Sequence, residues 1–323
     1  MKITIVAFDL WGFNKKIADH LIANGHEVTF IDSNAIRYIY KNNGERIMNF
    51  INKLFFKRNI KKDYLNKKMI EIIENSPTQD TIFIVNPKQF RPDILDLLRD
   101  KTNKFIAHNY DSLSRIPLPD NANILFDKIY SFDIDDVKKN KFLNLLTNFI
   151  YLDKEINNTP RNKAFMILSK SLEREITLSN IANILDRKKI TNYEFIVANP
   201  ATKKVNKKIL LTEKHVTLNI VIEKMKDAEI LIDLVRPNQT GLSFRIFEAM
   251  ALHKKIITNN ATIKEYDFYN DNNILIINDN IEDIPNSFLN TPYQPIPENI
   301  YYNYTLDNFV NTVFFDSKNS INV

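Results

Sequence analysis

The stretch DLVRPNQTGLSFRIFEAMALHKKIITNN, residues 233–260, contains the end of a strand, a polar loop, a helix and a second strand. The run at 230–234 is apolar except for Asp233, as expected for a strand buried on both faces of a parallel sheet. Apolar residues then recur at helical spacing over Phe244–Leu252, and Lys255–Thr258 begins another strand. This order is a βαβ unit, so we expect a doubly wound α/β domain here.

The N-terminus repeats the pattern. Residues 3–8 are largely apolar, a loop follows, and a helix with apolar positions at 17, 18, 21 and 22 ends at Gly25. The strand 28–32 completes a second βαβ unit. We expect further strands at 81–85, 104–107, Lys128–Ser131, 165–168, Tyr193–Ala198, 216–218 and 274–277, and helices around 94–98, 176–185 and 221–226.

At 323 residues the chain is long enough for two such domains. The polar segment 154–162 reads as the linker between them. We therefore expect an α/β fold with two Rossmann-like domains facing across a cleft. The predicted ranges are 1–157, 158–295 and a C-terminal helix and tail at 296–323. A helix at 306–315 is expected to pack back on the first domain.

The loop and helix start at 236–248 carry the strongest chemical pattern. Backbone N–H groups at a helix N-terminus bind anions, and Gly241 allows close approach, so this is a natural diphosphate site. Arginine suits phosphate geometry, and Lys170 and Arg174 follow another predicted strand. The candidate donor-binding residues are Lys170, Arg174, Arg236, Gln239, Thr240, Gly241, Leu242, Ser243, Arg245 and Glu248.

Residues 241–258 resemble the donor-binding segment of glycosyltransferases of the GT-B fold. In the retaining families a glutamate, seven residues and a second glutamate lead into an Ala-Met/Leu-Ala helix. Glu248-Ala249-Met250-Ala251 matches the second half of that pattern. The resemblance implies that Glu248 holds the nucleotide ribose. The first glutamate is replaced by Thr240, which leaves open whether transfer is retaining or inverting.

The resemblance implies transfer of a sugar from a nucleotide-sugar donor to a glycan or lipid-linked glycan acceptor. Residues 105–115 and 130–136 look like paired segments of bacterial lipopolysaccharide and capsule transferases. An inverting enzyme needs a base for the acceptor hydroxyl, and Asp9, His108 and Asp111 are candidates. The candidate acceptor-binding residues are Trp11, Gly12, Phe13, Tyr110 and Asp133.

Composition and motifs exclude several classes of protein and site. Cysteine is absent, which excludes disulfides and thiol chemistry, and no cofactor is expected. Asp133-Ile134-Asp135 matches the short metal motif of GT-A transferases, but a second α/β unit argues against that plan, so we expect a metal-independent enzyme. The first loop lacks the Gly-x-Gly-x-x-Gly fingerprint of nicotinamide oxidoreductases. A nucleotide-sugar epimerase or a non-catalytic sugar-binding envelope protein stays open.

The formal net charge of +5 comes largely from the basic segment 46–68, where lysines surround Leu54, Phe55 and Phe56. This segment is either a solvated helix face or a surface for anionic lipid or a phosphate-bearing acceptor. No nucleic-acid recognition motif accompanies it. No apolar run is long enough to span a bilayer. We expect a cytoplasmic protein. The lipid-binding interpretation of the basic segment would place it peripherally on the inner face of the plasma membrane.

Overall fold

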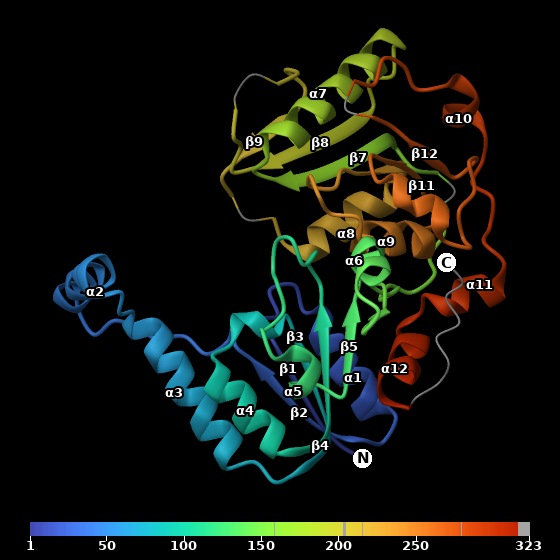
Figure 1. The fold of residues 1–323 in the computed structure, drawn as a ribbon. Helices are drawn as coiled ribbons and strands as arrows, with labels where there is room; N and C mark the ends of the chain where they lie inside the picture. Colours follow the sequence, from blue (N-terminus) through green and yellow to red (C-terminus); the bar gives the residue numbers. More distant parts are fainter. Residues whose placement is uncertain (158, 203–204, 215, 279, 316–323) are drawn as a thin grey trace. The chain divides into compact units, whose positions relative to one another are not determined.

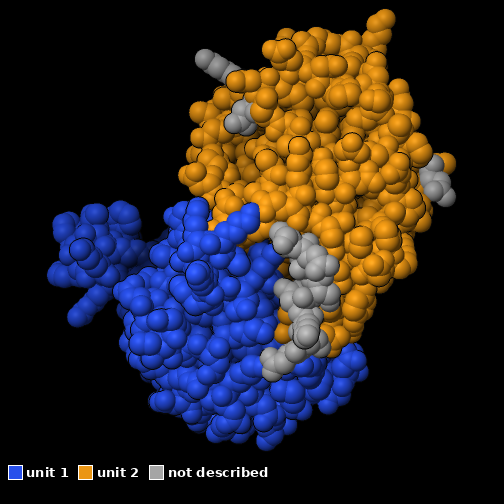
Figure 2. Space-filling model, turned by 45° about the vertical axis from the view of Figure 1, so that its right-hand side comes forward, with its two compact units in different colours: residues 1–132, 136–146, 313–315 blue, residues 133–135, 147–312, 316–323 orange. Residues whose placement is uncertain are grey.

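The computed structural model describes residues 1–157, 159–202, 205–214, 216–278 and 280–315. Position 158, within the predicted linker, and positions 316–323 of the predicted tail lie outside the described residues. The chain forms two compact units, coloured separately in Figure 2. Unit 1 contains Met1–Phe132, Asp136–Leu146 and Val313–Phe315. Unit 2 contains Asp133–Asp135 and 147–312.

Unit 1 is built on a six-stranded parallel sheet in the order β2-β1-β3-β4-β5-β6 (Figure 1). Its strands are β1 (Lys2–Ala7), β2 (Glu27–Asp32), β3 (Gln79–Val85), β4 (Thr102–Asn109), β5 (Lys128–Ser131) and β6 (Leu143–Leu145). The central strands are buried on both faces, which is why they read as nearly continuous apolar runs.

Helices connect these strands. They are α1 (Phe13–Ala23), α2 (Asn43–Phe56), α3 (Ile60–Glu74), η1 (Pro87–Gln89), α4 (Pro92–Asp100), α5 (Ala122–Leu125) and α6 (Ile134–Lys139). Gly12 precedes α1 with φ +81°, a left-handed backbone that glycine adopts without cost. The core joins Ile82 and Phe105 of the sheet to Met69 of α3 and Leu98 of α4.

Unit 2 has its own six-stranded parallel sheet in the order β12-β11-β10-β7-β8-β9. Counted along the chain within the unit, this is the order 6-5-4-1-2-3, which is that of dinucleotide-binding Rossmann domains. The strands are β7 (Asn162–Ser169), β8 (Tyr193–Ala198), β9 (Leu210–Thr212), β10 (Ala228–Asp233), β11 (Lys255–Thr258) and β12 (Ile274–Ile276). The helices are α7 (Leu172–Arg187), α8 (Leu218–Lys226), α9 (Phe244–Leu252), η2 (Ala261–Glu265), α10 (Asn286–Asn290), α11 (Glu298–Asn303) and α12 (Leu306–Phe314).

The predicted α/β fold class, with two Rossmann-like units, is confirmed. The final helix also returns as expected. The end of α12 belongs to unit 1, where the Phe314 ring lies 5.6 Å from that of Phe83 in β3. The ring centroid of Phe315 lies 5.1 Å from that of His26, a residue that follows α1.

One predicted strand is wrong. The run at 216–218 is not a strand, because Thr217 is the N-cap residue of α8 and Leu218 is the first helical residue. The strand that pairs with β8 is Leu210–Thr212 instead. A three-residue apolar run does not distinguish a strand from a helix start, and β-branched residues favoured the wrong choice.

Candidate functional site

A cavity of about 290 Å³ opens at the carboxyl ends of the strands of unit 2. The strand order reverses between β7 and β10, so the loops after these two strands diverge and leave a crevice. Its walls come from the segments that follow β7, β10 and β11. The lining residues are Glu173, Arg174, Thr177, Val235, Arg236, Pro237, Asn238, Gln239, Thr240, Asn259, Asn260, Ala261 and Thr262.

Four of the ten predicted donor-binding residues line this cavity: Arg174, Arg236, Gln239 and Thr240. The other six do not line it: Lys170, Gly241, Leu242, Ser243, Arg245 and Glu248. The sequence reasoning missed the wall after β11. Because β10 and β11 are adjacent parallel strands, with Asp233 opposite Thr258, residues 259–262 must lie beside the loop 235–241. The two apolar runs at 230–234 and 255–258 could have indicated in advance that the segments after these strands lie side by side.

Two arginines supply the positive charge of the cavity. Arg174 donates to the carbonyl oxygens of Ser169 at 3.0 Å and Leu234 at 3.3 Å, so its guanidinium spans the ends of β7 and β10. Arg236 is half-buried, and within the described residues its side chain makes no hydrogen bond or ion pair. The only carboxylate in the lining belongs to Glu173. Two guanidinium groups against one carboxylate favour an anionic ligand.

The loop 235–241 is held by asparagines at the end of β11. Asn259 accepts from the Val235 N–H at 2.8 Å, and Asn260 donates to the Thr240 carbonyl at 2.9 Å. Thr262 donates to the same carbonyl at 2.8 Å. The left-handed residue of the loop is Asn238, with φ 61°. The cavity wall is thus fixed to the sheet by side chain–backbone hydrogen bonds before any ligand arrives.

Asp133 fills part of the predicted anion site. Its carboxylate accepts the N–H groups of Thr240 at 2.9 Å and Gly241 at 3.2 Å, and the Thr240 hydroxyl at 2.5 Å. It also accepts the N–H of Asp135 at 3.1 Å, as the cap of α6. Asp133 is 2% exposed. Two of the N–H groups expected to face a diphosphate therefore face a carboxylate of the protein itself.

Glu248 is 4% exposed and lies in the middle of α9. It accepts a hydrogen bond from the Tyr151 hydroxyl and pairs with Arg245 at 3.1 Å. Burial and the neighbouring Glu248 charge raise the pKa of Tyr151 above its usual value. In this arrangement both Glu248 and Arg245 contact protein groups behind the loop. The ribose-binding role of Glu248 stays a prediction.

A second buried acid supports the same loop. Asp233, at the end of β10, accepts the Ser243 hydroxyl at 2.7 Å and the Thr258 hydroxyl at 3.4 Å. Burial raises the pKa of Asp233. Ser243 in turn caps α9 by accepting the Arg245 N–H at 3.1 Å. Asp233 thereby ties the start of α9 to the sheet.

In unit 1, the candidate bases differ in access. The His108 ring is fully buried, contacts the Leu146 carbonyl oxygen through Nε2 at 3.0 Å, and has a pKa lowered by burial to about 3. A neutral, enclosed imidazole is poorly placed to take a proton from an acceptor. The Asp9 carboxylate accepts the Lys15 N–H at 2.8 Å and is 8% exposed. Asp111 pairs with Arg115 at 2.7 Å and keeps 19% of its side chain exposed.

The candidate acceptor-side residues of unit 1 gather after β1 and β4. Trp11 is 43% exposed in the loop after β1, with Gly12 and Phe13 opening α1 behind it. Tyr110 follows β4, its ring 4.3 Å from that of His108. Burial, and then the Asp9 charge, raise the pKa of Tyr110 above its usual value. The structure thus brings Asp9 and Tyr110 into electrostatic contact.

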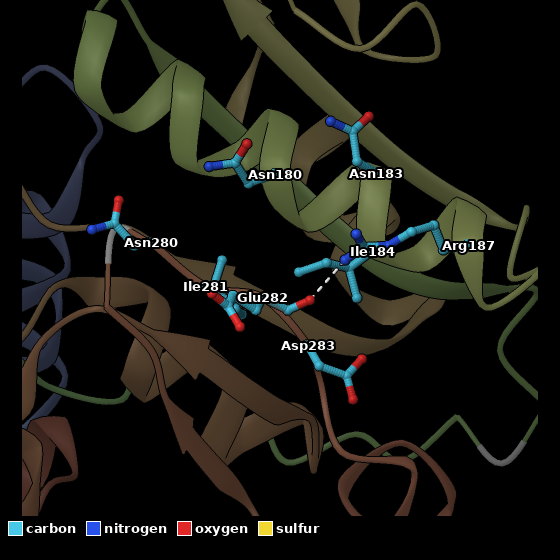
Figure 3. A pocket seen from close by; sticks show the side chains of 8 residues that line it. All are labelled: Asn180, Asn183, Ile184, Arg187, Asn280, Ile281, Glu282 and Asp283. Carbon is cyan, nitrogen blue, oxygen red and sulfur yellow. Dashed lines mark hydrogen bonds between the residues drawn. The ribbon is translucent and has the colours of Figure 1, made fainter.

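A larger hollow of about 740 Å³ lies beside the last turns of α7 (Figure 3). Its cations already have protein partners. Arg187 donates to the Glu282 carbonyl oxygen at 2.7 Å, and the adjacent Lys188 pairs with Asp283 at 2.8 Å. Asn180 and Asn183 complete the α7 wall. This hollow shows no concentration of unsatisfied charge and carries no chemical assignment.

Two properties of the described residues bear on other predictions. No group of three or more His, Asp or Glu side chains in them is arranged to hold a metal ion. Metal independence nonetheless stays a prediction. Among the same residues, no helix has the length and apolar character needed to cross a membrane.

No protein-family model matches the chain, and no curated protein matches its sequence. Solved structures do match its fold. A UDP-forming α,α-trehalose-phosphate synthase from Burkholderia xenovorans in complex with glucose-6-phosphate has a TM-score of 0.58 at 11% identity, covering 98% of this chain and 99% of that chain. The N-terminal domain of Candida albicans trehalose-6-phosphate phosphatase has a TM-score of 0.52 at 10% identity, covering 98% and 96%. The fold is GT-B-like.

Proposed function

We propose that this protein is a glycosyltransferase that uses a nucleotide-sugar donor and binds the donor phosphates in the cavity of unit 2. The observation that carries the proposal is the cavity itself. It lies at the switch point of a Rossmann-ordered sheet, where α/β folds bind nucleotides, and Arg174 and Arg236 line it. The GT-B-like fold and the Glu248-Ala249-Met250-Ala251 helix support the same function.

The proposed donor contacts follow from what each group already binds. Arg236, which has no partner within the described residues, is the main phosphate ligand, and Arg174 lies across the strand ends beside it. The amides of Asn238 and Gln239 provide hydrogen bonds to sugar and ribose hydroxyls. The Thr240 and Gly241 N–H groups contribute to phosphate binding only if Asp133 leaves them.

On the acceptor side, we assign the general base to Asp111. It is the most accessible of the three candidates in unit 1, whereas Asp9 holds the start of α1 and His108 is enclosed. Trp11 and Tyr110 are the aromatic rings proposed to contact the acceptor sugar. The acceptor is a surface glycan or its lipid-linked precursor, as the resemblance of residues 105–115 and 130–136 implies.

The test is a thermal-shift panel with UDP, GDP, CMP and dTDP. UDP comes first, because the fold neighbour from Burkholderia is UDP-forming. A nucleotide at about 100 times its Kd stabilises the native protein by about 2.7 kcal/mol. Arg236→Ala should abolish the shift. Arg161→Ala is the matched control, because Arg161 precedes β7, at the amino end of that strand and away from the cavity, and is largely exposed.

Two further measurements separate the alternatives. Asp111→Asn should keep the nucleotide shift and lose sugar transfer, since Asp111 lies in unit 1. Product analysis with the preferred nucleotide sugar distinguishes transfer from epimerisation. A protein that binds no nucleotide, or whose Arg236→Ala variant responds like wild type, would refute the proposal. Nucleotide binding without any turnover would instead favour a sugar-binding protein.

A further inference from the structure

Helix α2 carries its apolar side chains on the outside. Six of them form one stripe along the helix, at positions that fall within about 160° at 100° per residue. They are Ile47, Met48, Phe50, Ile51, Leu54 and Phe55, each between 37% and 71% exposed. Within the described chain, no ring contact involves the two phenylalanines. A stripe of this size is normally buried against a core.

The opposite face of α2 turns Asn49 and Glu45 inward, with Phe56, 67% exposed, at the C-terminal end of the helix. Asn49 is 2% exposed, donates to the Tyr40 hydroxyl at 2.7 Å and accepts the Ile60 N–H at 2.9 Å. Glu45 accepts the Tyr38 hydroxyl at 2.5 Å and the Lys41 N–H at 2.7 Å. These contacts fix the rotation of the helix, so the exposure of the apolar stripe is built in rather than incidental.

Within unit 1, α2 stands beyond the end of α3, away from the sheet (Figure 1). The space-filling view shows this part of unit 1 as a projection (Figure 2). The stripe is therefore open along its length on the side away from the sheet. Whatever covers it must come from outside this unit.

The surroundings of the stripe are strongly basic. Residues 41–62 contain seven basic side chains and one acidic one, Glu45, a net charge of +6. The whole chain carries +5, so the remainder carries −1. The basic residues are Lys41, Arg46, Lys53, Lys57, Arg58, Lys61 and Lys62. The excess positive charge of the protein is thus concentrated around one exposed apolar helix.

We propose that α2 docks on an anionic lipid surface, with its apolar stripe in the acyl-chain boundary and the basic residues on the headgroups. Apolar insertion and positive charge on one element are what such a surface recognises. A second copy of the same face is disfavoured, because it would set seven like charges against seven. A nucleic acid would satisfy the charge but leave the six apolar side chains exposed.

The experiment is sedimentation of the full chain with lipid vesicles. Vesicles of phosphatidylcholine with about 30% phosphatidylglycerol should carry the protein down, and pure phosphatidylcholine should bind at least about tenfold less. Raising the salt concentration should weaken binding, because headgroup attraction is screened. No nucleotide is present, so the result is independent of the proposed function of unit 2.

Two sets of variants test the two components. Phe50→Ser with Phe55→Ser should abolish binding, whereas Ile124→Ser, at an 84% exposed apolar site on α5, should leave it unchanged. Lys53→Gln, Arg58→Gln and Lys62→Gln together should remove the preference for anionic vesicles. Lys139→Gln, Lys207→Gln and Lys264→Gln, all at exposed positions outside the segment, are the charge control. Because the mutated side chains are exposed, folding should be retained, and circular dichroism checks this.

Several results would overturn the proposal. The proposal is wrong if the wild type stays in the supernatant with anionic vesicles. It is also wrong if the wild type binds equally to both vesicle types. Equal binding by wild type and the double Phe variant has the same meaning. A dimer in gel filtration that the double Phe variant converts to a monomer would identify the stripe as an interface between copies instead.

Discussion

The buried Glu248 and the half-buried Tyr151 form a hydrogen-bonded pair joined across 97 residues of sequence. A carboxylate in such a place needs its hydrogen bonds, since an unsatisfied buried charge is far more costly than an exposed one. Tyr151 and Arg245 provide them here. The pair fixes α9 to the segment before the linker, next to the helix start that the loop 235–241 leads into.

We predict that Tyr151→Phe lowers the free energy of unfolding by about 1.5–3 kcal/mol, because it leaves Glu248 short of one donor. Tyr302→Phe is the matched control. Tyr302 donates to Asp307 at 2.7 Å, but it is 45% exposed, so water replaces the lost bond and the cost stays below about 1 kcal/mol. Calorimetry of both variants measures the difference. Equal losses would contradict a special role for this pair.

His108 makes unit 1 sensitive to acid. Its pKa is lowered from 6.5 to about 3 by burial, so the native state keeps it neutral. As the pH falls below 6.5, His108 is protonated in the unfolded chain but stays neutral in the native chain. The free energy of unfolding therefore carries no penalty from His108 above pH 6.5. Between pH 6.5 and about pH 3 it falls by at most about 1.4 kcal/mol per pH unit.

His108→Gln should therefore flatten the fall in stability between about pH 6 and about pH 4, relative to wild type. The amide of glutamine can still donate to the Leu146 carbonyl oxygen. Urea unfolding followed by the fluorescence of Trp11 reports on unit 1, since this is the only tryptophan in the chain. Parallel curves for wild type and variant would show that His108 does not titrate differently in the two states.

At the scale of elements, the loop 235–241 depends on the strand beside it. Asn260→Ala removes the donor to the Thr240 carbonyl and the acceptor for the Thr262 N–H. We predict that hydrogen exchange in the loop rises about tenfold, as one or two net hydrogen bonds are lost. Asn183→Ala, on an exposed face of α7, is the control and should leave this loop unchanged. An unaltered loop in Asn260→Ala would mean that Asn259, Thr262 and Asp133 hold it without Asn260.

The sequence predicted the parallel strands well, because double burial makes them apolar runs with helical segments between. It also placed the helix Phe244–Leu252 and the strand Lys255–Thr258 correctly. The strand at 216–218 failed because three residues carry too little periodicity. For α2 the sequence drew attention only to Leu54, Phe55 and Phe56 among lysines, and the direction of the apolar face depends on Asn49, which no periodicity encodes.

The candidate site was predictable only in part, and the reason is sequence separation. The loop with Arg236, Gln239 and Thr240 was found from one contiguous segment. The contact of Asp133 with Thr240 joins residues 107 positions apart. Neither segment contains a local pattern that predicts this contact, because an aspartate before a helix is equally well explained as an N-cap.

At the scale of the whole molecule, α12 contributes to both units. Phe309 lies 4.8 Å from Phe149 of unit 2, whereas Phe314 lies 5.6 Å from Phe83 of unit 1. Both rings are 3% exposed. Each Phe→Ala change should cost about 3–5 kcal/mol, but in a different unit.

We predict that Phe314→Ala lowers the unfolding midpoint reported by Trp11 and speeds hydrogen exchange in β3. Phe309→Ala should instead speed exchange in unit 2 and leave the Trp11 transition close to that of wild type. Hydrogen exchange with mass spectrometry resolves the two units in one experiment. If both variants affect the same unit equally, α12 does not divide its contacts as described.

The return of residues Val313–Phe315 to unit 1 also has a consequence for synthesis on the ribosome. The rest of unit 1 is complete at Leu146, yet its last three residues follow the 166 residues from Thr147 to Thr312. At about 5–20 residues per second, that delay is roughly 10 to 30 seconds. During this interval the nascent first unit exposes the surface at Phe83 that Phe314 later covers.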